Sequence, residues 1–332
     1  MGAGKWTEAV EAGLYSVGLE AFIHFHNVAD PLSRISGRLH SFLQRMGLPG
    51  TFVTWPTMSN HRVYDLVRRK KTPLVVSLQG LMDRPTIEKI RSLNPIIRII
   101  YLHGTPVRDE EQLERILDLD SMVDALGIPY SGDLSKLQLR GTQHTCLFPF
   151  AACPYHHKAE LTRKARSRYG REVMLISRCG EYEEELVRLV SEELGRPVDV
   201  WGPGWSSSKH VTDNKMIFPP HHLEAFASST IVLNLHGPDC HEHNGLNQNF
   251  FEIAAVGGFQ ITEHQPVLEK SALGRYTATF KEPRELARKV SYYLQDHGAR
   301  ETMRSGLQNH VLENETYGHR FFQLLKSMGY SD

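Results

Sequence analysis

The residues best suited to bind a charged ligand stand in the second half of the chain, where each follows a short apolar run. An arginine, Arg178, comes after one such run, and glycines follow the next. A guanidinium group, tight glycine turns and helix N-termini together suit a phosphate or diphosphate, because all of them present N–H groups to an anion. The set consists of Ser177, Arg178, Gly180, Gly202, Gly204, Trp205, His236, Gly237 and Glu263.

A carboxylate, Glu252, stands in an otherwise apolar stretch, NQNFFEIAAVGG (247–258). The stretch predicts one short helix, because Asn247 or Asn249 can cap its N-terminus and the glycine pair at 257–258 ends it. A glutamate in the first turns of a helix interacts favourably with the helix dipole, by about 0.3–1 kcal/mol. The local sequence alone favours that structural role.

Short apolar runs and amphipathic stretches alternate along the chain. The apolar runs show no two-residue alternation of polarity, which is typical of parallel strands covered by helices on both faces. The pattern pauses in a connector, CLFPFAACPYHH (146–157), and then restarts, which predicts two doubly wound α/β domains. We expect strands at 21–28, 51–55, 73–80, 96–104, 171–180, 197–205, 231–237 and 259–263, and helices at 31–47, 60–71, 84–93, 182–195, 221–230 and 247–258.

The length of the chain, 332 residues, is long for one core and natural for two domains. We expect an N-terminal domain at 1–155 and a C-terminal domain at 156–332, with the option that the last helix packs back on the N-terminal domain. Ligands of such folds bind at the carboxyl ends of the strands, usually in the crevice between the domains.

Charge and composition argue against several functional classes of protein. Lys plus Arg and Asp plus Glu are both 38, and the one dense basic run, VRRKK (67–71), fits a helix C-terminus. Duplex nucleic acid is therefore not an expected partner. No stretch has the roughly 20 apolar residues of a membrane span, and the N-terminus lacks a signal-peptide core. Four scattered cysteines indicate free thiols in a reducing compartment, so we expect a cytoplasmic protein.

The second half of the chain also resembles a known family. NQNFFEIAAVGGFQITE (247–263), PRELARKVSYYLQD (283–296) and ENETYGHRFFQLL (313–325) are similar to the C-terminal domain of CgeB-like, spore-maturation-type glycosyltransferases. The resemblance is strongest after residue 171 and extends more loosely back to 73. It implies a GT-B fold, in which two Rossmann-like domains face each other across a cleft. It also implies a nucleotide-diphosphate sugar as donor substrate, bound by the C-terminal domain, and no cofactor.

The resemblance gives Glu252 a further role as a ligand of the donor ribose, because a carboxylate offers two acceptor oxygens to a vicinal diol. The helix N-terminus at 244–249 would hold the diphosphate, with Arg178 nearby. Trp205 would line the base pocket or belong to the core, and His236 would face the crevice or bond a neighbouring loop. The expected donor-binding residues are Ser177, Arg178, Gly202, Trp205, His236, Asn244, Asn247, Asn249 and Glu252.

Glycosyl transfer needs a stabilised leaving diphosphate and an acceptor hydroxyl that loses its proton as it attacks. If the reaction inverts the sugar's configuration, the candidate bases are His26, Asp30 and His103, which follow predicted strands of the first half. Asp30 can equally cap a helix starting at Pro31. The loop LHGPDCHEHNG (235–245) gathers histidines and acids without a standard zinc spacing, so we expect no metal.

Because of three departures from the family pattern, a function other than glycosyl transfer stays an alternative. Asn244 stands where many retaining GT-B enzymes have a glutamate, Asn249 stands where arginine is frequent, and the lysine commonly paired with Arg178 is missing. A catalytically silent module that binds a sugar nucleotide or a protein partner is therefore an alternative. A related enzyme, such as a nucleotide-sugar epimerase or a glycogen-synthase-like transferase, is another. The sequence does not identify the acceptor.

Overall fold

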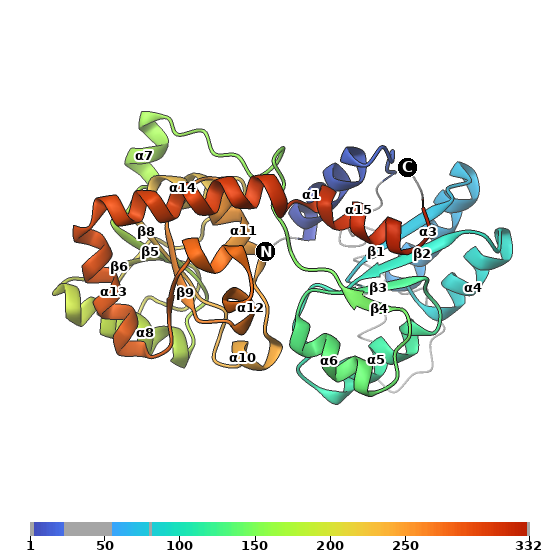
Figure 1. Cartoon of the computed structure of the whole chain (residues 1–332), viewed down its shortest axis with the longest axis horizontal. Coiled ribbons are helices and arrows are strands. Elements are labelled where there is room, and N and C mark those ends of the chain that lie inside the picture. Colours follow the sequence, from blue (N-terminus) through green and yellow to red (C-terminus); the bar gives the residue numbers. More distant parts are fainter. Residues whose placement is uncertain (1–2, 23–54, 80–81, 331–332) are drawn as a thin grey trace, which may run out of the picture. The chain divides into compact units, whose positions relative to one another are not determined.

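The computed structural model of the chain describes residues 3–22, 55–79 and 82–330. These residues form two compact units (Figure 1). Unit 1 contains the described residues before Pro149, apart from Glu8–Leu19, and the few that follow Ser327. Unit 2 consists of Glu8–Leu19 and Pro149–Ser327. Each unit has its own parallel sheet, which confirms the predicted α/β class.

The sheet of unit 1 has four parallel strands in the order β1-β2-β3-β4. The local sequence of helix α4 explains where this helix begins and which of its residues are buried. Asp83 accepts a hydrogen bond from the N–H of Thr86 at 3.0 Å, a proline lies in the first turn, and Ile87 and Ile90 are buried. The predicted bounds, 84–93, are confirmed. The elements are α3 (Trp55–Lys70), β1 (Leu74–Leu78), α4 (Arg84–Leu93), β2 (Arg98–Leu102), α5 (Glu110–Asp120), β3 (Ala125–Ile128), α6 (Ser131–Leu139) and β4 (Thr145–Leu147).

The sheet of unit 2 has six parallel strands in the order β10-β9-β8-β5-β6-β7. The chain enters at the central strand β5, runs outward through β6 and β7, and returns to β8 on the other side of β5. The strand order therefore reverses between β5 and β8, and this reversal point is where ligands bind in open α/β sheets. The strands are β5 (Val173–Ile176), β6 (Val198–Trp201), β7 (Val211–Asp213), β8 (Ile231–Asn234), β9 (Gln260–Glu263) and β10 (Ala278–Phe280).

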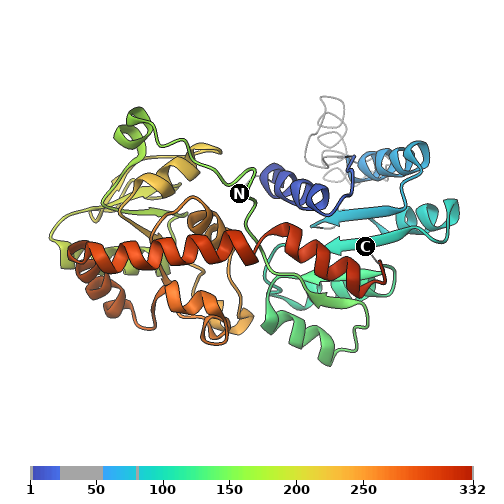
Figure 2. The same ribbon diagram turned by 45° about the horizontal axis from the view of Figure 1, so that its top comes forward.

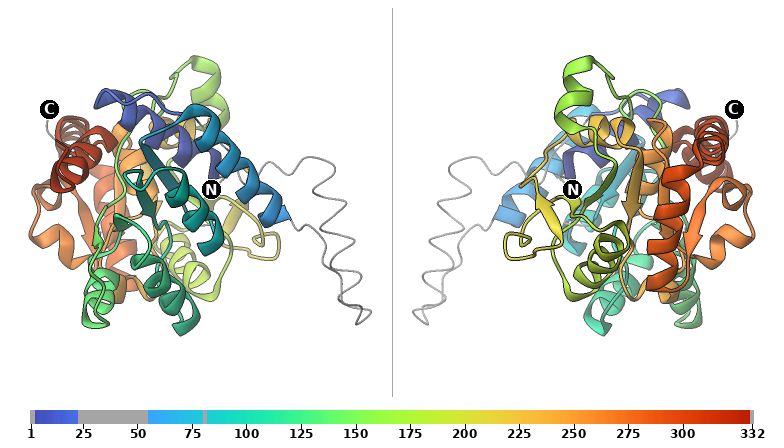
Figure 3. Two further views of the ribbon diagram at one scale, coloured as in Figure 1. Left: turned by 90° about the vertical axis from the view of Figure 1, so that its right-hand side faces the viewer. Right: turned by 90° about the vertical axis from the view of Figure 1, so that its left-hand side faces the viewer.

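Helices cover both faces of this sheet (Figure 1; Figure 3, right). In β5, Val173 and Leu175 pack with α8 (Glu181–Leu194) and α13 (Pro283–Gln295). Met174 faces the other way and packs with α7, α9 and α11. Alternate residues of one strand are thus buried on opposite faces, which explains why the strands lack polar alternation. The latter helices are α7 (Arg163–Tyr169), α9 (His221–Ser228) and α11 (Gln248–Ala255).

The remaining helices of the chain include one that the sequence analysis did not predict, α1 (Ala3–Ser16). Figure 2 shows the long helix α14 running along unit 2, where it packs against α11 and the 3-10 helix η1. Predicted elements at 23–54 lie outside the described residues. The remaining elements are α10 (Cys240–His243), α12 (Pro266–Glu269), η1 (Ala272–Tyr276), α14 (His297–Asn314) and α15 (Tyr317–Ser327).

The connector belongs to unit 2 from Pro149 onward, whereas the sequence analysis placed the division after residue 155. Ala152 donates its N–H to the carbonyl of Glu315 at 2.8 Å and accepts the N–H of Tyr317 at 3.0 Å. These bonds form a parallel bridge that ties the connector to the start of α15. Helix α15 itself groups with unit 2. Ala152 and Thr316 are 164 residues apart, so this backbone pairing leaves no local signal in the sequence.

Candidate functional site

Two turns meet at the reversal point of the unit 2 sheet. Residues 177–179 follow β5 and residues 202–204 follow β6. A Cβ added to Gly202 would lie 1.9 Å from the carbonyl oxygen of Ser177, so only glycine allows the two backbones to approach this closely. Gly204 has φ +93° and also lies against the first turn. The glycines expected at a ligand site therefore shape the turn that carries Arg178.

Trp205 occupies the position of a core residue. Its side chain is fully buried in the cluster formed by the sheet, α8 and α13. Its indole Nε1–H donates to the carbonyl oxygen of Ser177 at 2.9 Å. Of the two roles expected for Trp205, the structure favours the core, from which it holds the backbone next to Arg178.

Arg178 is exposed at the carboxyl end of β5. Its guanidinium group makes no hydrogen bond or ion pair with the part of the chain that the structure describes. An arginine held on a rigid turn without a protein partner keeps its five N–H donors for a ligand, and its geometry suits a phosphate.

The segment 244–249 leads into α11, and the side chains of two of its three asparagines make hydrogen bonds to the protein backbone. Asn247 caps the helix, because its Oδ1 accepts the N–H of Phe250 at 2.9 Å. Asn244 adopts a left-handed conformation, φ +48°, and its Oδ1 accepts the N–H of Val267 at 2.9 Å. Asn249 is half-buried, and its amide has no hydrogen-bond partner among the described residues. The first N–H groups of the helix have no acceptor within the helix.

Glu252 is a buried carboxylate on α11, 2% exposed. Its Oε2 accepts a hydrogen bond from Nε2 of His222 at 3.0 Å, and its Oε1 lies 3.8 Å from Nε2 of His157. Burial acts to raise the pKa of Glu252, but the hydrogen bond from His222 and the neighbouring imidazoles outweigh it and hold the pKa below the ordinary value. The group is therefore ionised at neutral pH.

A second set of bonds connects Glu252 to distant parts of unit 2. Gln248, one turn earlier on α11, helps to lower the pKa of Glu252, accepts the hydroxyl of Tyr317 at 2.6 Å and donates to the carbonyl of Ala151 at 3.4 Å. The connector, α9, α11 and α15 thus all contribute to the surroundings of one carboxylate. The sequence analysis missed His157 and His222, because their partner lies 95 and 30 residues away.

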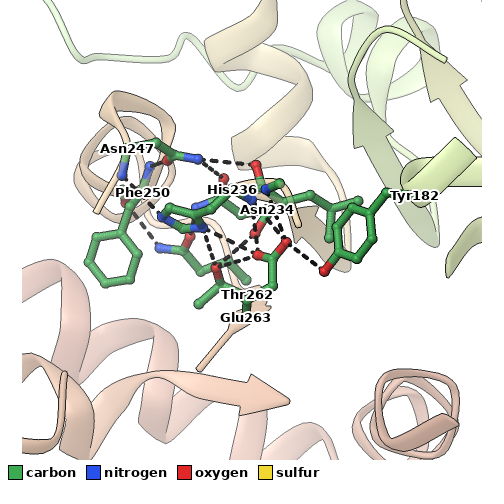
Figure 4. A network of polar contacts seen from close by, with 10 residues as sticks. Tyr182, Asn234, His236, Asn247, Phe250, Thr262 and Glu263 are labelled. Atoms are coloured by element: carbon green, nitrogen blue, oxygen red, sulfur yellow. Dashed lines mark hydrogen bonds and ion pairs between the residues drawn. The ribbon is translucent and has the colours of Figure 1, made fainter. Parts of the chain in front are cut away.

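His236, at the carboxyl end of β8, is engaged on both ring nitrogens (Figure 4). Its Nε2 accepts the backbone N–H of Asn247 at 3.0 Å, so the ring proton resides on Nδ1. Nδ1 donates to Oγ1 of Thr262 at 3.0 Å, since that hydroxyl donates its own proton to the carbonyl of Asn234. His236 therefore supports the N-terminus of α11 rather than presenting a free ring to a ligand.

Glu263 organises the same sheet edge (Figure 4). Its carboxylate oxygens each accept the backbone N–H of His236 at 3.0 Å, and its Oε1 accepts the hydroxyl of Tyr182 at 3.2 Å. Burial, followed by the charge of Glu263, raises the pKa of the Tyr182 phenol well above its usual range. The sequence indicated Glu263 only by its place after a strand, and Tyr182 not at all.

Of the candidate bases, His26 and Asp30 lie outside the described residues, and His103 lies in unit 1 at the carboxyl end of β2. Its Nε2 lies 3.2 Å from Oγ1 of Thr105, and its Nδ1 is buried without a hydrogen-bond partner in the described ranges. Burial lowers the pKa of His103, against the opposing charge of Asp133. The ring is therefore neutral at neutral pH, which a proton acceptor requires.

Within the described residues, no group of three or more His, Cys, Asp or Glu side chains is placed to hold a metal ion. In the histidine-rich loop, His243 pairs with Asp239 at 3.4 Å. The four cysteines are free thiols, as the sequence predicts. No helix in the described part of the chain is long and apolar enough to cross a bilayer.

Residues 171–326 match a family described as glycosyl transferase-like. The match covers a little less than half of the chain and contains every strand of unit 2. A search of curated protein sequences found no match.

Solved structures resemble the chain over 83% to 99% of its length. HepE (Alr3699) of Anabaena, in complex with UDP-glucose, has a TM-score of 0.62 at 10% identity, covering 99% of this chain and 96% of HepE. The α,α-trehalose 6-phosphate synthase of Burkholderia multivorans has a TM-score of 0.57 at 12% identity, covering 83% and 76%. The N-terminal domain of Candida albicans trehalose-6-phosphate phosphatase has 0.59 at 11%, covering 99% and 88%. These likenesses show that the chain has the predicted GT-B fold.

Proposed function

We propose that the protein is a glycosyltransferase that moves a sugar from a nucleotide-diphosphate donor to an acceptor, and that unit 2 binds the donor. One observation carries the proposal: the glycosyl transferase-like match spans the sheet whose reversal point presents Arg178, which has no side-chain partner among the described residues. The GT-B fold shared with HepE, which was crystallised with UDP-glucose and with UDP, supports a nucleotide-sugar donor.

In this proposal Arg178 and the N-terminus of α11 bind the diphosphate, and Glu252 binds the ribose. Arg178 supplies a fixed positive charge where negative charge develops on the leaving group. The side chain of Glu252 is 3% exposed, so ribose hydroxyls reach it only after a neighbouring side chain moves aside. His236 acts indirectly by accepting the N–H of Asn247 at the start of α11, and Glu263 fixes the backbone of His236.

For the acceptor, the proposed base is His103, whose neutral ring can take the proton of an attacking hydroxyl. His26 and Asp30 stay candidates on sequence grounds. We further propose a metal-independent reaction without a cofactor, in which Arg178 and the N–H groups of the helix bind the diphosphate and offset part of its negative charge. A CgeB-like specialisation and a cytoplasmic location are the narrower parts of the proposal.

A catalytically silent module is a second candidate, and the side chain of Asn244 favours it. Where many related enzymes have a glutamate, this chain has an amide whose oxygen is bonded to the backbone of Val267. A residue used in this way caps a turn and offers no carboxylate to a donor sugar. The two candidates share the nucleotide site and differ in turnover.

Thermal unfolding with a panel of nucleotides and nucleotide-sugars tests the donor site. A ligand at about 100 times its Kd stabilises the folded state by about 2.7 kcal/mol, which is easily measured. We expect stabilisation by one nucleoside diphosphate and its sugars, and loss of this effect in Arg178→Ala. Release of the diphosphate with an acceptor panel supports the transferase, whereas binding without release favours the silent module. No stabilisation by any nucleotide contradicts both.

A further inference from the structure

We infer that His222 and His157 are positioning residues that orient the Glu252 carboxylate toward the ribose of the donor. The inference rests on the proposed role of Glu252 and adds two residues that the sequence motifs do not identify. His222 comes from α9 and His157 from the connector, so neither belongs to the helix that carries the carboxylate.

The geometry places one imidazole at each carboxylate oxygen. Nε2 of His222 lies 3.0 Å from Oε2, a normal hydrogen bond, and Nε2 of His157 lies 3.8 Å from Oε1, which is too long for a hydrogen bond. Two side chains from other elements thus meet the carboxylate, one at each oxygen, and limit its rotation. The carboxylate has about four lone-pair directions, so acceptor sites remain for ribose hydroxyls.

The backbone determines which nitrogen of His157 faces Glu252. The N–H of Cys153 donates to Nδ1 of His157 at 3.0 Å, so the proton of the ring is on Nε2, the atom that points to the carboxylate. The short span from Cys153 to His157 therefore sets both the tautomer and the direction of this side chain. His157 is buried, and rotation of its ring would break the bond to Cys153.

The other ring nitrogen of His222 shows that packing alone does not explain this residue. Nδ1 is buried and has no hydrogen-bond partner among the described residues. Burying an unpaired ring nitrogen has a desolvation cost that a phenylalanine would avoid. The ring otherwise packs edge-on against Phe226, as an aromatic hydrocarbon would. The bond from Nε2 to Glu252 is therefore the feature that requires a histidine.

A positioning role predicts a specific change in ligand discrimination. Without the donor from His222, the carboxylate turns away from its bound orientation, and its contact with the ribose weakens. Hydrogen bonds to charged groups correspond to about a tenfold or larger change in affinity. Because the ribose is bound alike in the ground state and the transition state, KM for the donor should rise about tenfold while kcat stays within about twofold.

The test compares UDP with 2′,3′-dideoxy-UDP by calorimetry in the full-length wild type, His222→Phe and Glu252→Gln. We expect the wild type to prefer UDP clearly, and His222→Phe to bind both ligands almost equally. His222→Gln, which keeps an N–H donor, should restore part of the preference. His221→Phe is the matched control: its side chain is half exposed, it pairs with Glu224, and the preference should not change. A purely structural role of His222 would weaken both ligands equally.

The outcomes separate this inference from the proposed function. If Glu252→Gln loses the preference for UDP and His222→Phe keeps it, the positioning role is overturned while the donor site stands. If Glu252→Gln also keeps it, Glu252 is not the ribose ligand and the inference is overturned with that assignment. If the wild type binds no nucleotide, both are overturned. Should His222→Phe not fold, His157→Leu decides: loss of the preference supports the inference, and an unchanged preference overturns it.

Discussion

Replacing Gly202 by alanine should destabilise unit 2 far more than alanine at an ordinary left-handed glycine. The new Cβ would lie 1.9 Å from the carbonyl oxygen of Ser177 and 2.7 Å from its carbonyl carbon, so backbone must move. Overpacking of this kind costs about 1–3 kcal/mol. The shift also breaks the bond from the Trp205 indole to Ser177, about 0.5–1.5 kcal/mol, and the positive φ adds about 1–2 kcal/mol of strain. We expect a total loss of about 3–6 kcal/mol.

Urea unfolding followed by circular dichroism measures this loss, with Gly195→Ala as the matched control. Gly195 also has a positive φ, +65°, but a Cβ there meets open space, so only the strain of about 1–2 kcal/mol should appear. Nucleotide binding by Gly202→Ala, measured where the protein is still folded, should also weaken, because the displaced turn carries Arg178. Equal destabilisation by the two substitutions would refute the close approach of the two turns and its role in shaping the site.

Three further predictions concern side chains of the same sheet edge. Arg178→Ala should lower kcat/KM for the donor at least tenfold without changing the free energy of unfolding. Arg288→Ala, at another exposed arginine, should change neither quantity, and a steady-state assay and urea unfolding check both expectations. Tyr182→Phe should lose about 1.5–3 kcal/mol of stability in urea, because it removes a hydrogen-bond donor to the charged Glu263, and an unchanged stability would contradict that bond. The pKa of Glu252 is lowered on folding, so its carboxylate stabilises the protein above the ordinary value of 4.5, and this contribution is lost as the pH falls through the lower folded value. Glu252→Gln should therefore destabilise more at pH 7 than at pH 4 in urea unfolding, and an equal effect at both pH values would count against the lowered pKa.

The parts of the candidate site that depend on chain order were predictable. Apolar runs without alternation gave parallel strands, and the carboxyl ends of such strands meet at one edge, so Arg178, Gly202 and His236 were expected together. The structure places these three residues after neighbouring strands of one sheet. The helix with Glu252 was predictable for the same local reason, since an asparagine cap and a glycine end suffice to define it.

Roles that depend on a distant partner were not predictable. The sequence left open whether His236 faces the crevice or bonds a neighbouring loop, and the structure shows that the N–H of Asn247 and the hydroxyl of Thr262 occupy its two nitrogens. Trp205 was among the expected donor-binding residues, but its side chain is buried against α8 and α13 in the core.

The sequence by itself thus determined the repeating βα pattern, the two parallel sheets and the set of residues at their carboxyl ends, because these follow from local periodicity and chirality. Tertiary structure decided which of those residues are engaged by the protein and which remain available to a ligand. It brought His222 and His157 from 30 and 95 residues away to Glu252, while leaving Arg178 without a partner among the described residues. Hydrogen bonds in a buried site are made across elements, and the approach of those elements is set by packing of the whole core.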